Sequence, residues 1–169
     1  MERFRETTLV LLAADLAGFT RAVAALDPVA LARFLDAYYA RAGEVVVRHG
    51  GHVVKFMGDA CFAVFPQESC AGAVDCAETL ASEQEQVPGA QLAVAPGVNV
   101  HLGVVAEGEL GAGADRRYDV VGAEVNRLFR MGSGPGLRIS EQVYLRLPAE
   151  RRAAWHRHEP SAAYTRRLH

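Results

Sequence analysis

Two aspartates stand at the ends of apolar segments, where a carboxylate could bind a metal ion. Asp15 directly follows the apolar and β-branched run 7–14, and Asp59 lies in the short turn between the runs 52–57 and 61–65. If these strands lie side by side in one sheet, both carboxylates reach the same edge. Such a pair suits a hard cation such as Mg²⁺, held together with phosphate oxygens. Two other interpretations stay open: Asp15 caps the helix that follows it, or the two aspartates lie in unrelated surface turns.

A lysine inside the second apolar run is the next candidate for chemistry. Lys55 lies four residues before Asp59. The two-residue alternation of a strand predicts Val54 and Phe56 on one face of the sheet and Lys55 on the other. Because an unpaired buried ammonium group is costly, Lys55 either reaches solvent or meets a specific acceptor.

The segments around these residues have clear secondary-structure patterns. Asp27-Pro28 opens the longest predicted helix, with Asp as the N-cap, and this helix ends near Gly50-Gly51. Residues 67–85 predict a second helix, and residues 98–105 predict a strand in which His101 is a packed histidine rather than a metal ligand. The first helix has an apolar stripe that predicts a core or subunit contact. Its positions are Leu31, Phe34, Leu35, Tyr38, Ala42, Val45 and Val46.

The second half of the chain contains a further polar pair. A short strand is predicted over residues 116–121, and the helix that begins at Gly122 places Asn126 and Arg130 one turn apart on one face. The inward positions of that helix are predicted to be Val125, Leu128 and Phe129.

The order of these elements predicts the fold class. A brief strand at 137–139, a short helix capped by Ser140 and an edge strand at 162–168 follow the polar helix, and His156 and His158 are expected to be exposed and structural. The order β-α-β-β-α-β, with a hairpin in the middle, predicts a ferredoxin-like α+β sandwich with a C-terminal strand–helix–strand extension. The 169 residues suffice for one substantial core, so we expect a single domain over residues 1–169.

Charge and cysteine content exclude several classes of partner. The formal net charge is −2, so no broad basic field favours nucleic acid or an anionic membrane surface. The three cysteines lack Cys-x-x-Cys spacing and are odd in number, which argues against a disulfide framework. The apolar run 9–14 is too short to cross a membrane. We therefore expect a cytoplasmic protein that binds neither nucleic acid nor membranes.

Taken together, three polar motifs resemble those of the class III nucleotidyl cyclases. They are ADLAGFT at 14–20, VKFMGDA at 54–60 and YDVVGAEVNRLFR at 118–130. The motifs occur in the family's order and extend over most of the chain, and every polar position is filled. A single one of them would be a weak signal, but three in order are a strong one.

This resemblance implies a role for each residue of the acidic end. Asp15 and Asp59 correspond to the two metal-binding aspartates, and the carbonyl of Leu16 is an added ligand for a pair of Mg²⁺ or Mn²⁺ ions. The tripeptide Gly18-Phe19-Thr20 resembles the phosphate-binding turn of the family. The metals would bind the triphosphate, activate the ribose 3′-hydroxyl and neutralise the leaving pyrophosphate.

The remaining motif residues correspond to groups that contact the rest of the nucleotide. Arg130 would stabilise charge on the α-phosphate, and Asn126 would orient the ribose. Lys55 and Asp119 fall at the base-selecting positions of the family. A lysine donor for the purine N1 and an aspartate acceptor for an exocyclic amine fit adenine, so the resemblance implies that the substrate is ATP.

In this family the site forms between two chains. By resemblance, Asp15 and Asp59 act in one site, while Lys55, Asp119 and the Asn126–Arg130 pair of the same chain serve the site of the partner. A homodimer would then contain two complete sites, and an unidentified regulatory domain or protein would control them.

Two alternatives remain besides an adenylate cyclase that makes 3′,5′-cyclic AMP. The family usually has small residues between Asn126 and Arg130, whereas this chain has Arg127, Leu128 and Phe129. A helix altered in this way leaves open a catalytically weak or inactive module for nucleotide binding or dimerisation. A ferredoxin-like domain that binds RNA or protein is the third interpretation.

Overall fold

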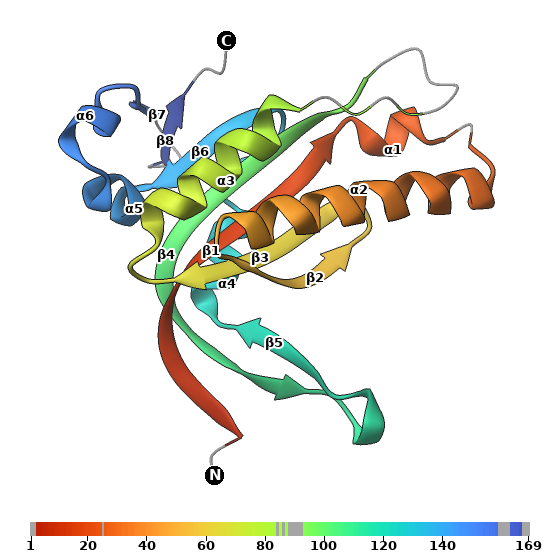
Figure 1. The fold of residues 1–169 in the computed structure, drawn as a ribbon, viewed down its shortest axis with the longest axis horizontal. Coiled ribbons are helices and arrows are strands. Elements are labelled where there is room, and N and C mark those ends of the chain that lie inside the picture. The colour runs from red at the N-terminus through yellow and green to blue at the C-terminus, as the bar shows by residue number, and fades with distance from the viewer. Residues whose placement is uncertain are drawn as a thin grey trace.

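The protein is described by a computed structural model covering residues 3–24, 26–83, 85, 87, 93–158 and 163–166. Two long antiparallel strands form its centre, β1 (Phe4–Ala17) and β4 (Ala95–Leu110), and the hairpin of β2 (His52–Met57) and β3 (Ala60–Pro66) extends the sheet on the β1 side (Figure 1). Within the described residues the sheet has 8 strands, in the order β2-β3-β1-β4-β6-β8-β7, with β5 also pairing with β4.

Two helices cover one face of this sheet. α2 (Pro28–Arg48) and α3 (Cys70–Ser82) connect β1 to β2 and β3 to β4, so the first four strands and these helices have the predicted βαββαβ order. Asp27 caps α2 as expected, because its side chain accepts hydrogen bonds from the N–H groups of Val29 and Ala30. Apart from Leu31, the predicted stripe of α2 lies in or against the core with alternate residues of β1, and the architecture confirms the ferredoxin-like prediction.

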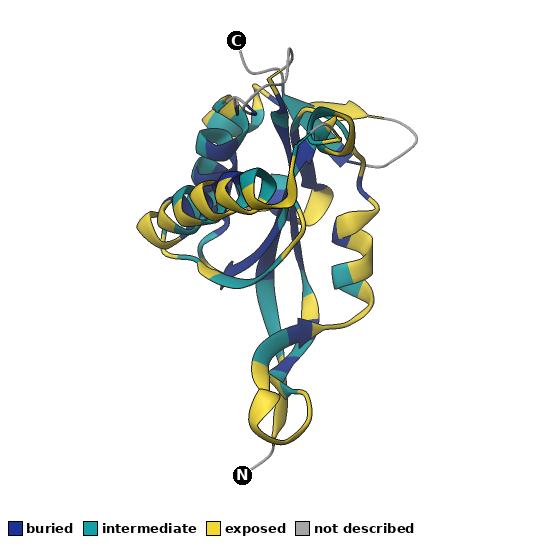
Figure 2. Cartoon of the chain, turned by 90° about the vertical axis from the view of Figure 1, so that its right-hand side faces the viewer, coloured by how far each residue is buried: buried dark blue, intermediate teal, exposed yellow. Residues whose placement is uncertain are grey.

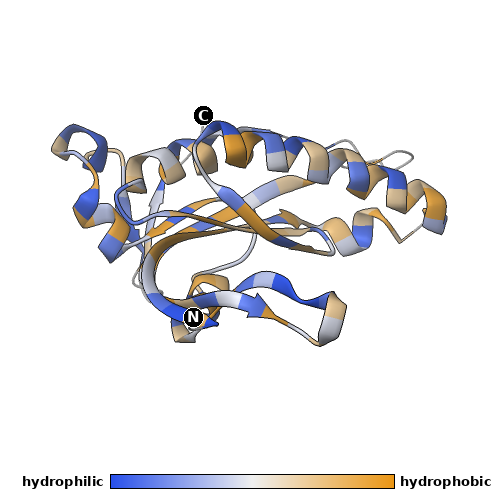
Figure 3. Ribbon diagram, turned by 60° about the horizontal axis from the view of Figure 1, so that its bottom comes forward, coloured by the Kyte–Doolittle hydropathy of each residue, from blue (hydrophilic) through white to orange (hydrophobic). Residues whose placement is uncertain are grey.

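The opposite face of the sheet is covered by shorter elements. β5 (Arg117–Val121) folds back on the outer half of β4, and α4 (Ala123–Phe129) packs beneath the sheet (Figure 3). The residues of β1 that point this way, Leu11 and Ala13, form a second core cluster with Leu128 of α4. The central strands are therefore buried on both faces, whereas the strands of the β4–β5 arm are partly exposed (Figure 2).

The C-terminal extension contains more elements than expected. β6 (Gly136–Ser140) pairs in parallel with β4 and is followed by α5 (Glu141–Arg146), α6 (Ala149–Arg152), β7 (His156–His158) and β8 (Ala163–Arg166). A 3₁₀ turn, η1 (Gly113–Asp115), joins β4 to β5, and α1 (Phe19–Ala22) follows β1. The rings of Tyr144 and Tyr164 stack 3.9 Å apart and join α5 to β8.

Some predicted boundaries differ in the structure. α3 is shorter than the helix predicted over 67–85, and β4 begins three residues before the strand predicted over 98–105. His156 and His158 are exposed as expected but form an edge strand. Positions 162, 167 and 168 of the predicted edge strand lie outside the described residues.

The face assignment within β2 was wrong. The register of β2 against β3 shifts between Val53 and Lys55, which is a β-bulge. As a result Val53 and Phe56 pack on the helix-covered side, and Val54 packs on the opposite side. The extra residue of a bulge reverses the two-residue alternation, so strict periodicity failed here.

Among the helices that the structure describes, none has both the length and the apolar character needed to cross a membrane.

Candidate active site

Asp15 and Asp59 lie together at one end of the neighbouring strands β1 and β3. Ala14 is the register partner of Cys61, and the main-chain N–H of Leu16 donates to Asp59 Oδ2 over 3.2 Å. Gly18 is the N-cap residue of α1 and no side chain caps that helix, so Asp15 is not a helix cap. The two aspartates also do not lie in unrelated turns, because Asp59 reaches the main chain next to Asp15.

A tyrosine of α2 holds the turn that contains Asp59. Gly58 and Asp59 form a two-residue hairpin loop, and Gly58 has a φ of 62°, a left-handed conformation that glycine adopts without steric cost. The hydroxyl of Tyr39 donates to the carbonyl of Gly58, and its ring stacks on Phe56 with 4.1 Å between centroids. The longest helix therefore fixes the loop that presents Asp59.

Lys55 was expected to reach solvent or to meet a specific acceptor, and it does both, since 40% of its side chain is exposed. Its Nζ donates to Asp119 Oδ1 over 2.9 Å and to Oδ2 over 2.7 Å. The two residues are 64 apart in sequence and meet because the β5 arm lies against β2, where His52 and Tyr118 also make an edge-to-face contact. Lys55 and Asp59 thus lie on the same hairpin but contact different partners, Asp119 and the main chain of Leu16.

Asn126 and Arg130 lie at the exposed side of α4. Arg130 follows the last residue of the helix, and its Nε donates to the main-chain carbonyl of Asn126 over 3.2 Å. Both side chains are exposed. Within the described part of the chain, neither residue forms an ion pair or hydrogen bond with Asp15, Asp59, Lys55 or Asp119.

The large residues between Asn126 and Arg130 are accommodated without disrupting α4. Leu128 is fully buried, and the ring of Phe129 lies 5.8 Å from that of Phe62. Phe129 was expected to face inward, but 41% of it is exposed, so its ring only covers the edge of the core.

Comparison with known proteins identifies the family of this chain. Residues 1–161 match the adenylate and guanylate cyclase catalytic domain family. The chain belongs to this family. The resemblance inferred from the three motifs is therefore confirmed.

The proteins that this cyclase domain resembles include an adenylate cyclase and a guanylyl cyclase. An uncharacterized protein of Mycobacterium tuberculosis is 30% identical over 155 residues, which cover 83% of this chain and 27% of that protein. The adenylate cyclase of Anabaena cylindrica is 28% identical over 153 residues, which cover 80% of this chain and 30% of that protein. The crystal structure of the guanylyl cyclase Cya2 has a TM-score of 0.81 at 24% identity, covering 97% of this chain and 93% of that one. The chain spans less than a third of the length of these curated relatives.

The acid pair of this cyclase domain fits a divalent cation. Burial raises the pKa of Asp15 above its ordinary value and the nearby Asp59 raises it further, whereas Arg138 and a main-chain hydrogen bond act in the opposite direction. A divalent cation would relieve the repulsion between two such carboxylates. Among the described residues no group of three or more His, Cys, Asp and Glu side chains gathers, so main-chain and substrate oxygens would complete the coordination.

The turn after β1 leads through Gly18 into the short helix α1. Gly18 adopts a φ of 81°, and Phe19 and Thr20 begin α1. The first N–H groups of any α-helix lack intrahelical partners, so they are free to donate to phosphate oxygens. Phe19 stacks against Phe34 of α2 at 6.1 Å, which fixes the turn against the core.

Two residues next to the acid pair had no signal in the sequence. Tyr38 was predicted only as part of a stripe for a core or subunit contact, yet its buried hydroxyl has no hydrogen-bond partner among the described residues. Burial raises its pKa, and Cys61, Asp59 and Asp15 raise it further. Arg138 of β6 donates to the carbonyl of Ser133 over 2.7 Å and to that of Gly134 over 3.2 Å, next to Asp15. Only the parallel pairing of β6 with β4 could reveal this neighbourhood.

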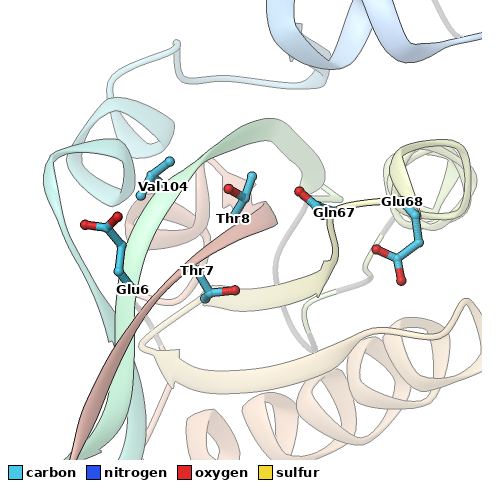
Figure 4. Close-up of a pocket in the computed structure, with 6 residues that line it drawn as sticks. All are labelled: Glu6, Thr7, Thr8, Gln67, Glu68 and Val104. Atoms are coloured by element: carbon cyan, nitrogen blue, oxygen red, sulfur yellow. The ribbon is translucent and has the colours of Figure 1, made fainter. Parts of the chain in front are cut away.

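A polar hollow on the molecule lies apart from these residues. It is formed where the outer part of β1 and β4 faces the loop before α3 (Figure 4). Its lining residues are Glu6, Thr7, Thr8, Gln67, Glu68 and Val104. None of the predicted site residues lines it, so this hollow is separate from the candidate site.

Proposed function

We propose that this domain converts ATP into 3′,5′-cyclic AMP and pyrophosphate, at sites that form between two copies of the chain. Membership of the cyclase family supports the reaction class. The observation that favours ATP is the contact between Lys55 and Asp119, which places a cationic donor and an anionic acceptor next to each other.

The Lys55–Asp119 pair would read the edge of adenine. A lysine ammonium has three N–H donors, and a carboxylate has about four lone-pair sites, so each group retains capacity for the base. Lys55 would donate to N1, and Asp119 would accept from the exocyclic amine. Guanine presents an N1–H and a carbonyl at the same edge, so each group would face a group of its own kind. Such mismatches leave buried polar groups without partners and are strongly rejected.

The acid pair would hold the catalytic metal ions. Asp15, Asp59 and the Leu16 carbonyl would ligate Mg²⁺ or Mn²⁺, two ions per site. When bound, such ions polarise phosphoryl oxygens and lower the pKa of a coordinated hydroxyl. The N–H groups at Gly18-Phe19-Thr20 would donate to the terminal phosphates.

The exposed pair on α4 would act on the reacting centre. Arg130 can donate two parallel hydrogen bonds to oxygens of the α-phosphate, where negative charge develops in the transition state. Asn126, one turn earlier, would hold the ribose so that its 3′-oxygen faces the phosphorus.

Two copies would complete the site, because these groups are not in contact among the described residues of one chain. The acid pair makes no described contact with Asn126, Arg130 or the Lys55–Asp119 pair. A second copy would supply its Lys55, Asp119, Asn126 and Arg130 to the acid pair of the first. The homodimer would then have two equivalent sites.

Mixing of defective variants tests this proposal. Cyclic AMP formation with ATP and Mn²⁺ should be lost in Asp59→Ala and in Arg130→Ala, and should return when the two proteins are mixed, because one intact site then forms. No product from the unaltered protein with either metal, while ATP still binds, would instead support an inactive nucleotide-binding module. Failure of the mixture to regain activity would contradict sharing of the site.

A further inference from the structure

The short helix α4 needs more than apolar packing to stay in place. It has seven residues, of which Leu128 is the only buried one, and no side chain caps its N-terminus. Helices of this length have little stability of their own. Yet Asn126 and Arg130 at this helix must be held accurately if they act on the substrate.

Two buried polar side chains of β4 hold both ends of this helix. Nε2 of His101 contacts Glu124 Oε2 in the first turn of α4. Nδ2 of Asn99 donates to the carbonyl of Leu128 over 3.2 Å and to that of Gly132 over 3.0 Å, at and beyond the last turn. Asn99 and His101 are two positions apart on one strand, so they project from the same face of the sheet.

Helix α4 packs closely against β4 where His101 contacts Glu124. A Cβ atom at Gly103 would lie 2.7 Å from Glu124 Cβ and 2.6 Å from its Cγ, so only glycine allows Glu124 to approach β4. His101 is fully buried, and its strand partner on β1 is the apolar Leu11.

The charge state of the pair follows from its surroundings. Nδ1 of His101 is buried and has no hydrogen-bond partner among the described residues, so a proton there would be unpaired. Burial lowers the pKa of His101 and nearby Arg127 lowers it further, whereas Glu124 raises it, and the net direction is downward. At neutral pH the histidine is therefore a neutral donor through Nε2, and Glu124 is the acceptor.

We propose that the His101–Glu124 contact, together with Asn99, positions α4 so that Asn126 and Arg130 are aimed at the substrate. This inference rests on the proposed cyclase function of those two residues. His101 and Glu124 act through the helix and are positioning residues.

Glu124→Gln and His101→Phe test the inference, with Glu141→Gln as the matched control. Glu141 is also an acidic residue in the first turn of a short helix, but it is exposed and has no described polar contact. With ATP and Mn²⁺ we expect kcat to fall by about 10²-fold in His101→Phe, since small misplacements of a catalytic group have effects of that size. KM should change little, because the base contacts lie on β2 and β5. A smaller fall in kcat is expected for Glu124→Gln, and no change for the control.

Mixing locates the defect within the dimer. His101→Phe should regain activity when mixed with Asp59→Ala, which has an intact α4. It should not regain activity with Arg130→Ala, whose defect lies in the same half-site. Rescue by both partners, or by neither, would overturn the assignment to α4.

Amide hydrogen exchange tests the anchoring independently of turnover. Amides of α4 should exchange faster in His101→Phe and in Glu124→Gln than in the control, while those of α2 are unchanged. Unchanged exchange in α4 would overturn the inference, even if activity is lost. Faster exchange in α4 of a protein that makes no cyclic nucleotide would support the anchoring and reject only the proposed function. If His101→Phe does not fold, the exchange of the α4 amides in Glu124→Gln alone tests the inference.

Discussion

At the scale of single residues, the acid pair contains two negative charges that do not stabilise the fold. At the partly buried strand end, burial raises the pKa of Asp15, and repulsion from Asp59 raises it further. Such strain is common at binding sites, where the ligand supplies the missing countercharge. Lys55 and Asp119 differ, because they neutralise each other in the free chain.

The raised pKa of Asp15, caused first by burial and then by Asp59, predicts a gain in stability when its charge is removed. The folded-state pKa of Asp15 is raised above the ordinary value of 3.8, so the penalty for ionising it in the fold is present at neutral pH. Asp15→Asn should therefore raise the thermal midpoint of the metal-free protein at pH 7 by on the order of a few degrees. Mn²⁺ should raise the midpoint of the unaltered protein but not that of the variant.

The pH dependence checks the sign of this effect. As the pH falls through the folded pKa and below 3.8, Asp15 becomes protonated in both states and the advantage of Asp15→Asn should vanish. An advantage that persists unchanged in acid would show that ionisation of Asp15 is not its cause.

The base-reading residues predict a change in nucleotide preference. Replacing Lys55→Glu and Asp119→Cys together removes the donor for adenine N1 and the acceptor for its amine. The ratio of kcat/KM for ATP to that for GTP should fall by at least 10-fold, since a mispaired buried polar group costs about 1–3 kcal/mol. Steady-state assays with both nucleotides measure the ratio, and an unchanged ratio would remove this account of base selection.

At the scale of elements, the β4–β5 arm is held by one buried carboxylate. Glu107 of β4 accepts from the hydroxyl of Tyr118 in β5 over 2.5 Å and from Nε of Arg5 in β1 over 2.5 Å. Burial would raise the pKa of Glu107, but the bonds from Tyr118 and Arg5 outweigh it, and the net pKa is lowered. Because Asp119 follows Tyr118, this carboxylate also fixes one of the base-reading residues.

Glu107→Gln should loosen the arm and weaken ATP binding. We expect a loss of about 1.5–3 kcal/mol in the free energy of unfolding at pH 7, the usual net value of a hydrogen bond to a charged group. Since the folded pKa of Glu107 is lowered, this stabilisation is present above its ordinary value of 4.5 and is lost as the pH falls through the folded pKa. Urea unfolding at pH 7 and pH 4 measures the difference, and KM for ATP should rise more than kcat falls. A loss of equal size in acid would contradict the assigned role.

At the scale of the whole molecule, the two groups of site residues belong to different parts of the fold. The acid pair lies where β1 meets the β2–β3 hairpin, and the other residues lie on the face covered by α4 and β5. Large apolar side chains are exposed on and near that second face, including Val121 at 40% and Phe129 at 41%. These exposed apolar side chains support the proposed interface with a second copy.

Activity should therefore depend on protein concentration. Specific activity per chain should fall on dilution, in parallel with the fraction of dimer measured by sedimentation in the presence of ATP and Mn²⁺. Constant specific activity from a species that sediments as a monomer would contradict the shared site.

Sequence patterns alone predicted the ferredoxin-like order and the helix stripe of α2, because periodicity and capping are local properties. The family was inferred from the resemblance of three motifs and confirmed by comparison. The patterns also placed Asp59 in a hairpin turn and Asn126 one helical turn before Arg130. Tertiary structure decided which groups meet: Lys55 with Asp119, His101 with Glu124, and Arg138 beside Asp15. It also reversed the faces of Val53 and Val54 through a bulge. These contacts depend on strand register and on what covers each face of the sheet, and both are set by non-local pairing and burial.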